Sequence, residues 1–240
     1  MKGKLTIKNI FSVLLCLSLT TFCFFGCDKE DEEWTKAVAE YRANKMSIYQ
    51  EENSLYEDYQ VDVAFLGDSL TDGYDVKAYY PQYLVSNRGI GGDTTFDLEN
   101  RLQVSAYDLK PKVAVMLIGA NNMKSMFDNY ERILIGFTQN LPNTKIILLS
   151  LTSMSGEWGK NNQLAAYNNI KIKALAEKYS FRYVDLYSAL FNLETGEICS
   201  NYTTDGGHLT SDGYEVLTRQ ITPIIEEQLL VWNYQNQVSN

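Results

Sequence analysis

The chain has 240 residues, of which 45% are hydrophobic and 21% are charged, and its formal net charge is −9. This is the composition of an ordinary globular protein, long enough for one domain with a sizeable core. The acidic balance argues against a protein that binds nucleic acid or adheres to anionic bilayers by charge.

The N-terminus has the pattern of a secretion signal. Three lysines precede the apolar run Ile10–Phe25, and the first acidic residue is Asp28, as expected for a segment that is removed on export. The run is short for a transmembrane helix. It ends at Phe24-Phe25-Gly26-Cys27, which resembles a bacterial lipobox, a motif whose cysteine is lipidated and becomes the mature N-terminus.

We therefore expect residues 1–27 to be a lipoprotein signal peptide. The rest of the chain would be exported and anchored at Cys27 to a membrane of the bacterial envelope, on the periplasmic face or the cell surface. An uncleaved anchor is the alternative, and it would also place the domain outside the membrane. Without residues 1–27 the chain carries 18 basic and 30 acidic residues, a net charge of −12.

Residues 28–60 are predicted to form an acidic tether followed by a helix. Residues 28–33 are almost all acidic, which is typical of a solvated tether and also resembles the acidic export tags of some surface lipoproteins. From Trp34 to Gln60, large apolar residues recur at loosely helical spacing without glycine or proline. We expect a helix packed on the outside of the domain, while its high charge leaves open a stalk that holds the domain off the membrane.

Cysteine usage argues against a disulfide or a zinc site. Cys16 and Cys23 lie in the predicted signal peptide and Cys27 is the predicted lipidation site, so only Cys199 remains. One cysteine forms no disulfide within the chain, and with a single histidine it forms no zinc site. We expect neither a metal nor another cofactor.

From Val61 onward, short apolar runs alternate with helical patterns, which predicts a parallel sheet. Runs without polar alternation, such as Val113–Ile118, are typical of strands covered on both faces. The pattern predicts a three-layer α/β/α sandwich over residues 61–232, followed by a C-terminal tail at 233–240. We expect the last helix to begin near Ser211 or Asp212, with Glu215 in a capping box. The predicted strands are 61–66, 83–86, 113–118, 145–151 and 181–186.

Ser69 is the first candidate for a reactive side chain. It follows the first predicted strand in the sequence Gly67-Asp68-Ser69-Leu70, and reacting groups in α/β sheets gather at the carboxyl ends of strands. A serine in such a turn is also a common helix cap. The catalytic interpretation gains support from His208, the single histidine, which lies three residues after Asp205. These residues supply a nucleophile, a base and a group to orient the base.

Two further loops follow predicted strands and could bind an anion. Residues 87–94 carry three glycines, which would let the backbone approach a ligand closely. Thr94 stands where the dinucleotide fingerprint needs its third glycine, and this argues against that function. Asn121, in the next loop, could donate an amide hydrogen to an oxyanion, although both loops could equally be ordinary turns.

Taken in order, Gly67-Asp68-Ser69-Leu70, Gly92, Asn121 and Asp205-x-x-His208 resemble the four sequence blocks of the SGNH (GDSL) hydrolases. The resemblance covers residues 61–230 and is closest to the branch with the platelet-activating-factor acetylhydrolase catalytic subunits and related bacterial acyl esterases. It implies a flavodoxin-like, parallel five-stranded sheet. One departure is Asn122, where this family commonly has an aspartate.

The resemblance also implies a role for each candidate residue. Ser69 would be the nucleophile, His208 the general base and Asp205 the group that orients it. The backbone N–H groups of Ser69 and Gly92, together with the side-chain amide of Asn121, would form the oxyanion hole. The chemistry agrees, since histidine is the side chain that titrates near neutral pH without a large shift.

We therefore expect an exported serine esterase that removes a short acyl group, with acetyl as the leading candidate, from a small-molecule, glycan or lipid ester. Two other interpretations stay open. One is a hydrolase of lipid acyl chains such as a lysophospholipase, against which the acidic charge argues. The other is a catalytically silent, glycan-binding lipoprotein on the same fold. Residues 153–162, with Trp158, are expected at the rim of the site or as an ordinary surface loop.

Overall fold

The computed structural model describes residues 28–238, so the predicted signal peptide and Cys27 lie outside the described residues. The chain divides into two units, residues 1–41 and 42–240. Helix α2 (Asp28–Asn53) begins in the first unit, and its residues 42–53 belong to the second. The acidic run 28–33 is helical and continuous with the rest of α2. A helix suits this run because acidic side chains near a helix N-terminus interact favourably with the helix dipole.

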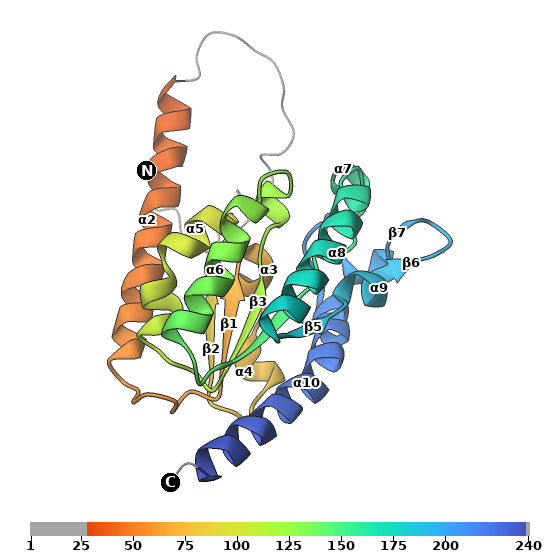
Figure 1. Ribbon diagram of the computed structural model, residues 1–240. Helices are drawn as coiled ribbons and strands as arrows, with labels where there is room; N and C mark the ends of the chain where they lie inside the picture. Colours follow the sequence, from red (N-terminus) through yellow and green to blue (C-terminus); the bar gives the residue numbers. More distant parts are fainter. Residues whose placement is uncertain (1–27, 239–240) are drawn as a thin grey trace. The chain divides into compact units, whose positions relative to one another are not determined.

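The second unit contains a parallel five-stranded sheet with the order β2-β1-β3-β4-β5 (Figure 1). In register, Val63 of β1 lies between Val85 of β2 and Val113 of β3. All residues of β1 and β3 are buried, as their unbroken apolar sequences predict. The expected α/β class and the flavodoxin-like sheet are therefore confirmed. The strands are β1 (Val63–Gly67), β2 (Val85–Gly89), β3 (Val113–Leu117), β4 (Lys145–Leu149) and β5 (Arg182–Val184).

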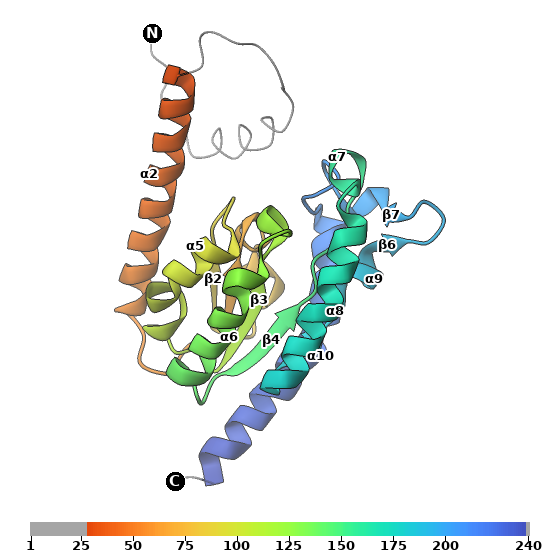
Figure 2. The ribbon, with the colours of Figure 1, turned by 45° about the horizontal axis from the view of Figure 1, so that its top comes forward.

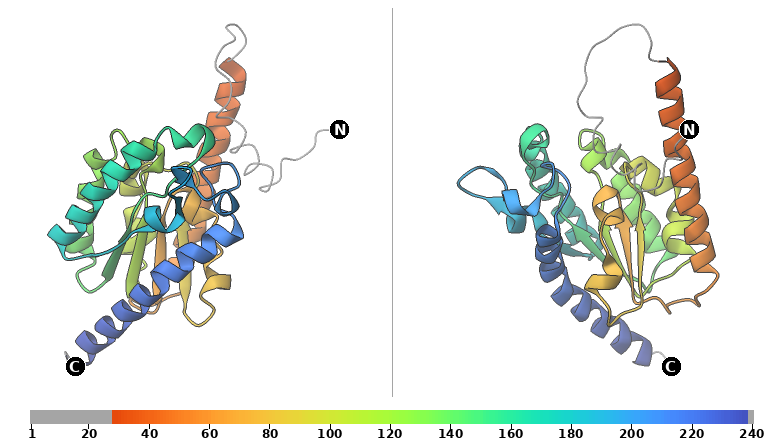
Figure 3. Two further views of the ribbon diagram at one scale, coloured as in Figure 1. Left: turned by 90° about the vertical axis from the view of Figure 1, so that its right-hand side faces the viewer. Right: turned by 180° about the vertical axis from the view of Figure 1, so that it is seen from behind.

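Helices cover both faces of the sheet (Figure 3). Successive strand residues point to opposite faces, so Phe65 belongs to one hydrophobic cluster and Leu66 to the other. The Phe65 cluster includes the apolar face of α10 (Ser211–Val238), and the Leu66 cluster includes α5 (Thr95–Asn100), α6 (Phe127–Asn140) and α8 (Asn162–Tyr179). The predicted three-layer sandwich is thus confirmed.

Several short elements complete the second unit. One of them, the hairpin β6–β7, follows α9 and projects from the unit close to α7 (Figure 2). Its two-residue strands carry too little pattern to be predicted from the sequence. The short elements are α3 (Ser69–Asp72), α4 (Val76–Tyr79), the π-helical turn η1 (Gln103–Tyr107), the 3₁₀ turns η2 (Ala120–Asn122) and η3 (Ser200–Tyr202), α7 (Gly156–Gly159), α9 (Leu186–Leu190), β6 (Phe191–Asn192) and β7 (Glu197–Ile198).

The last helix, α10, begins at Ser211 as expected, but with a different cap. The hydroxyl of Thr210 accepts the backbone N–H of Gly213 at 3.2 Å, so Thr210 is the capping residue. The third helical position is then a glycine, and the predicted capping box with Glu215 is wrong. The helix continues to Val238, beyond residue 232. Within residues 28–238, no helix combines the length and apolarity needed to cross a bilayer.

Candidate active site

Ser69 lies in the turn that follows the central strand β1. The strand ends at Gly67 and helix α3 begins at Ser69. Asp68 caps this helix, because its Oδ1 accepts the backbone N–H of Leu70 at 3.1 Å. The turn packs so closely that a Cβ at Gly67 would lie 2.2 Å from the carbonyl oxygen of Leu117. Ser69 is therefore presented, partly exposed, at the carboxyl edge of the sheet.

His208 approaches Ser69 from the loop before α10. Its Nε2 lies 3.0 Å from Ser69 Oγ, and its Nδ1 lies 2.8 Å from Asp205 Oδ2. Residues that are 139 positions apart in the chain are thus within hydrogen-bond distance. The structure brings together Ser69, His208 and Asp205 in the order that the sequence analysis predicts.

Asp205 is held as an ionised acceptor. Its Oδ1 accepts the backbone N–H groups of Gly207 at 2.9 Å and of His208 at 2.7 Å. Burial alone would raise the pKa of the Asp205 carboxyl, but these hydrogen bonds and the one to the His208 ring outweigh burial and hold that pKa below its usual range. The carboxylate therefore favours the ring tautomer with a proton on Nδ1, which leaves Nε2 to accept the proton of Ser69.

The loop that carries Asp205 and His208 is fixed from two sides. Thr203 forms an antiparallel bridge with Leu209, and its hydroxyl accepts the backbone N–H of Gly206 at 2.8 Å. Gly206 has a φ of +91°, a backbone conformation that favours glycine. Its carbonyl accepts the backbone N–H of Ser155 at 2.9 Å. The segment 153–162 therefore contacts the catalytic loop directly.

Asn121 and Gly92, the predicted oxyanion donors, lie on adjoining loops. Asn121 Nδ2 donates to the carbonyl of Asp93, the residue after Gly92, at 2.9 Å. An amide nitrogen carries two hydrogens, so this bond leaves one for a substrate oxygen. Gly92 is exposed, and its φ of +80° favours glycine. The structure thus joins the two loops, while the oxyanion role of these groups stays a prediction.

Asn122, where this chain departs from the resemblance, makes two hydrogen bonds to one residue. Its Oδ1 accepts the backbone N–H of Thr95 at 3.2 Å, and its Nδ2 donates to the Thr95 hydroxyl at 2.9 Å. An aspartate could accept the first bond but could not donate the second. The amide therefore fixes this loop to the start of α5 by itself.

A buried charge cluster supports the glycine loop, and the sequence analysis missed it. Asp93, whose side chain is fully buried, pairs with Arg101 Nε at 2.6 Å and with Arg42 Nη2 at 2.9 Å. Arg101 also donates to the carbonyls of Gly67 at 2.9 Å and Arg88 at 2.8 Å. Burial raises the pKa of Asp93 against the opposing effect of the arginines. The cluster ties the end of β1 to the loop that carries Gly92.

Residues 42–53 of α2 contribute further support. Lys45 Nζ lies 2.6 Å from Asp72 Oδ1, and Asp72 Oδ2 accepts the backbone N–H of Gly91 at 2.9 Å. The buried Tyr49 donates its hydroxyl hydrogen to the carbonyl of Gly89 at 2.6 Å. Asp72 closes the short helix that begins at Ser69, so these contacts link that helix to the glycine loop.

Asp68 is a second carboxyl group beside the serine. It is 1% exposed, and burial raises its pKa to about 7. Its Oδ2 is buried and has no hydrogen-bond partner within the described residues. A carboxyl group in this position is partly protonated at neutral pH. The sequence motif alone did not indicate this burial.

Trp158, predicted at the rim, lies beside the catalytic loop. A Cβ at Gly207 would stand 3.1 Å from Trp158 Cδ1 and Nε1, so the indole ring packs directly on the residue before His208. Trp158 also helps to line a pocket of about 440 Å³ that includes Asn121. The segment 153–162 is therefore at the site and is not a remote surface loop.

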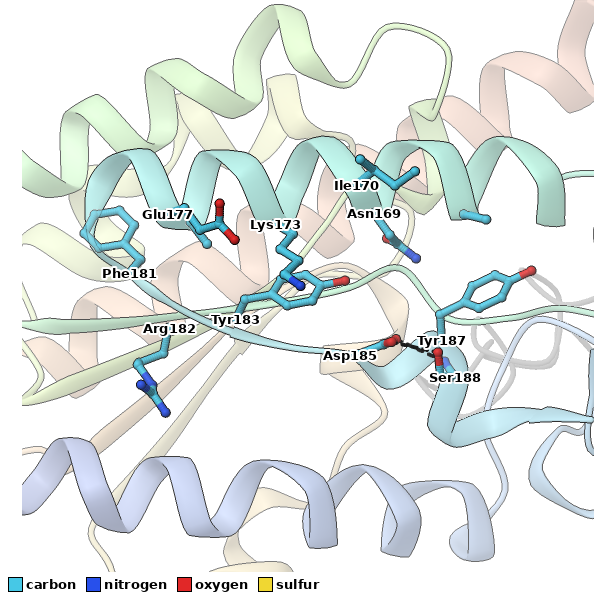
Figure 4. A pocket seen from close by; sticks show the side chains of 12 residues that line it. Asn169, Ile170, Lys173, Glu177, Phe181, Arg182, Tyr183, Asp185, Tyr187 and Ser188 are labelled. Carbon is cyan, nitrogen blue, oxygen red and sulfur yellow. Dashed lines mark hydrogen bonds between the residues drawn. The ribbon is translucent and has the colours of Figure 1, made fainter.

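A larger pocket, of about 670 Å³, lies elsewhere, between α8 and the segment of β5 and α9 (Figure 4). Tyr183 and Tyr187 line it together with charged side chains such as Lys173. None of the candidate catalytic residues lines this pocket. Across residues 28–238, no group of three or more histidine, cysteine or acidic side chains could hold a metal ion.

A three-layer sandwich around a parallel sheet, with hydrogen-bonded serine, histidine and aspartate at the carboxyl edge of the sheet, is typical of a class of serine hydrolases. The sequence profile of the GDSL-like Lipase/Acylhydrolase family matches residues 65–216, more than half of the chain. The chain belongs to this family. No curated protein matches the sequence.

Solved structures share the fold at low sequence identity. A GDSL-like lipase from Bacteroides thetaiotaomicron has a TM-score of 0.67 at 23% identity, over 76% of this chain and 97% of its own. A Streptococcus pneumoniae protein, described as a candidate platelet activating factor, has a TM-score of 0.66 at 22% identity, over 82% and 98%. An acetyl xylan esterase variant from Geobacillus stearothermophilus has a TM-score of 0.58 at 21% identity, over 70% and 95%.

Proposed function

We propose that this family member is an exported serine esterase that removes a short acyl group, acetyl in the first place, through an acyl-enzyme. The observation that carries the proposal is the continuous hydrogen-bonded chain from Ser69 Oγ through the His208 ring to Asp205. Serine needs such a base to become nucleophilic near neutral pH. A silent binding protein would have no use for this arrangement.

In the proposed reaction, Ser69 Oγ attacks the ester carbonyl carbon while its proton passes to His208 Nε2. The negative charge that develops on the carbonyl oxygen is stabilised by the N–H groups of Ser69 and Gly92 and by the Asn121 amide. His208 then gives its proton to the leaving alcohol oxygen, and the C–O bond breaks. Water, deprotonated by the same nitrogen, attacks the acyl-enzyme and regenerates Ser69. Asp205 stabilises the imidazolium throughout.

Two features support a short acyl group over a lipid chain. One of the similar folds belongs to an acetyl xylan esterase. The net charge of −12 also disfavours work at an anionic bilayer.

Ester turnover tests the proposal. The full chain in detergent should hydrolyse p-nitrophenyl acetate, and Ser69→Ala should remove the enzymatic rate while it preserves the circular dichroism spectrum. A series of p-nitrophenyl esters from acetyl to dodecanoyl should show the highest kcat/KM at the short end. Equal turnover by Ser69→Ala would show that Ser69 is not the nucleophile. A maximum of kcat/KM at long acyl chains would indicate a lipase and contradict the proposed short-chain esterase.

A further inference from the structure

The 440 Å³ pocket lies between the loop of the predicted oxyanion residue and a tryptophan that packs on the catalytic loop. One wall is the loop 120–125, which carries Asn121, and the other is formed by Trp158, Asn161 and Leu164. Trp158 packs on Gly207, which precedes His208. Asn121, which would contact the carbonyl oxygen of the ester, therefore lines the pocket directly, and Trp158 joins the pocket to the loop that carries His208.

The position of Trp158 assigns the pocket to the alcohol side of the ester. His208 Nε2 must reach the leaving oxygen to protonate it, so the alcohol lies beside the loop that carries His208. Trp158 is the large side chain that packs on this loop. An alcohol that extends away from Nε2 would therefore meet the Trp158 ring.

Several polar side chains in the lining of the pocket can form hydrogen bonds to a ligand. Within residues 33–237, the side chains of Lys124, Ser125 and Asn161 make no hydrogen bond or ion pair with the protein. Asn122, in contrast, is committed to Thr95. The three uncommitted side chains can donate hydrogen bonds, and two of them can also accept.

An aromatic ring next to uncommitted donors and acceptors suits one class of alcohol. A sugar ring has a C–H face that packs on an indole and hydroxyl groups at its edge that need hydrogen bonds. We propose that this pocket binds the sugar ring of an O-acetylated carbohydrate, with the ring on Trp158 and its hydroxyl groups bonded to Asn161 and Lys124. This inference rests on the esterase activity proposed above and specifies its substrate class.

The test compares a sugar ester with an ester whose alcohol is too small to contact the Trp158 ring. Acetate release from xylose tetraacetate and from ethyl acetate is followed with the full chain in detergent. Trp158→Ala should lower kcat/KM for the sugar ester about tenfold or more, mainly through KM, and should change that for ethyl acetate less than about twofold. Asn161→Ala should act in the same direction with a smaller effect.

Two further variants make the result specific. Trp158→Phe keeps an aromatic ring against Gly207 and should retain most of the activity on the sugar ester. Retained activity in this variant would show that the sugar ester requires the aromatic ring at this position. Tyr167→Ala removes another aromatic side chain, 55% exposed and outside the pocket lining, and should leave both substrates unaffected.

Each contrary result has a definite meaning. An equal loss on both esters, in Trp158→Ala and Trp158→Phe alike, would make Trp158 a structural support of the loop and overturn the inference. Faster hydrolysis of ethyl octanoate by Trp158→Ala, with sugar-ester turnover unchanged, would place the acyl group in the pocket and also overturn it. If the wild type hydrolyses neither acetate ester, the proposed esterase function itself fails.

Discussion

The hydrogen bonds of Asp205 indicate that it orients the His208 ring. Asp205→Asn can still accept the two backbone N–H groups on its oxygen, but its amide nitrogen would then face His208 Nδ1. The ring would have to carry its proton on Nε2, where it cannot accept one from Ser69. We expect kcat for p-nitrophenyl acetate to fall by up to about 10⁴-fold with the thermal unfolding curve little changed. Near-wild-type kcat would show that Ser69 and His208 act as a dyad.

The buried carboxyl group of Asp68 should make the stability of the protein depend on pH. Its folded pKa, about 7, is above the ordinary value of 3.8. As pH rises through this interval, the unfolded side chain loses its proton first, so the wild type loses stability. Asp68→Asn keeps the cap to Leu70 and removes this penalty. Its free energy of unfolding relative to wild type should increase by on the order of 1 to 4 kcal/mol between pH 4 and pH 8.

Urea unfolding of both proteins at these two pH values provides the measurement. Carboxyl groups remote from Asp68 titrate alike in the two proteins, so the change with pH in the difference between them reports on Asp68 and on its electrostatic neighbours Asp93 and His208. A difference that stays constant from pH 4 to pH 8 would mean that the Asp68 carboxyl ionises in the folded protein as it does in water.

At the scale of elements, the link from α2 to the glycine loop can be tested through one lysine. Lys45→Met removes the ion pair between Lys45 and the nearly buried Asp72, while Asp72 still accepts the Gly91 N–H. We expect unfolding to become about 1 to 3 kcal/mol easier and kcat to fall severalfold, because the loop with Gly92 loses support. Lys36→Met, which breaks an exposed pair with Glu40 in the same helix, should cost less than about 0.5 kcal/mol. Equal effects of the two substitutions would contradict the link.

The elements that carry the site were predictable because each has a strong local signal. β1 and β3 are unbroken apolar runs, and Ser69, Asn121 and His208 follow in loops whose turn residues mark the ends of elements. The pairing of Asp93 with Arg42 and Arg101 was not predictable. A buried charged side chain needs partners, which distant segments can supply, and nothing in the local sequence around Asp93 indicates which segments these are.

Boundaries were less accurate than the identity of the elements. β5 covers residues 182–184 instead of 181–186, because Asp185 caps α9 by accepting the N–H of Ser188 at 3.0 Å. Helix α2 ends at Asn53, before the predicted end at Gln60. A turn with Tyr59 at a φ of +61° follows it, and this turn is held by the bond from the Tyr59 N–H to the Lys110 carbonyl at 2.9 Å. Tertiary contacts of this kind override helical spacing.

At the scale of the whole molecule, export and lipid attachment stay proposals that depend on Cys27. The several acyl chains of a bacterial lipoprotein anchor it stably, whereas one chain binds only marginally. When the full-length gene is expressed in a bacterium, the protein should enter the detergent phase of a Triton X-114 partition, and Cys27→Ser should move it to the aqueous phase. Recovery of both forms in the aqueous phase would rule out the lipoprotein assignment.

The central claim is that Ser69 forms a covalent bond with the substrate acyl group while His208 serves as the base. An alkyl fluorophosphonate tests it most directly, because phosphorus bonds to an activated serine oxygen, fluoride leaves and the adduct is stable. Peptide mapping by mass spectrometry should locate one adduct on Ser69 in the wild type, and Ser69→Ala and His208→Ala should remain unlabelled. An active wild-type protein that takes up no label, or a label on a different residue, would contradict the account.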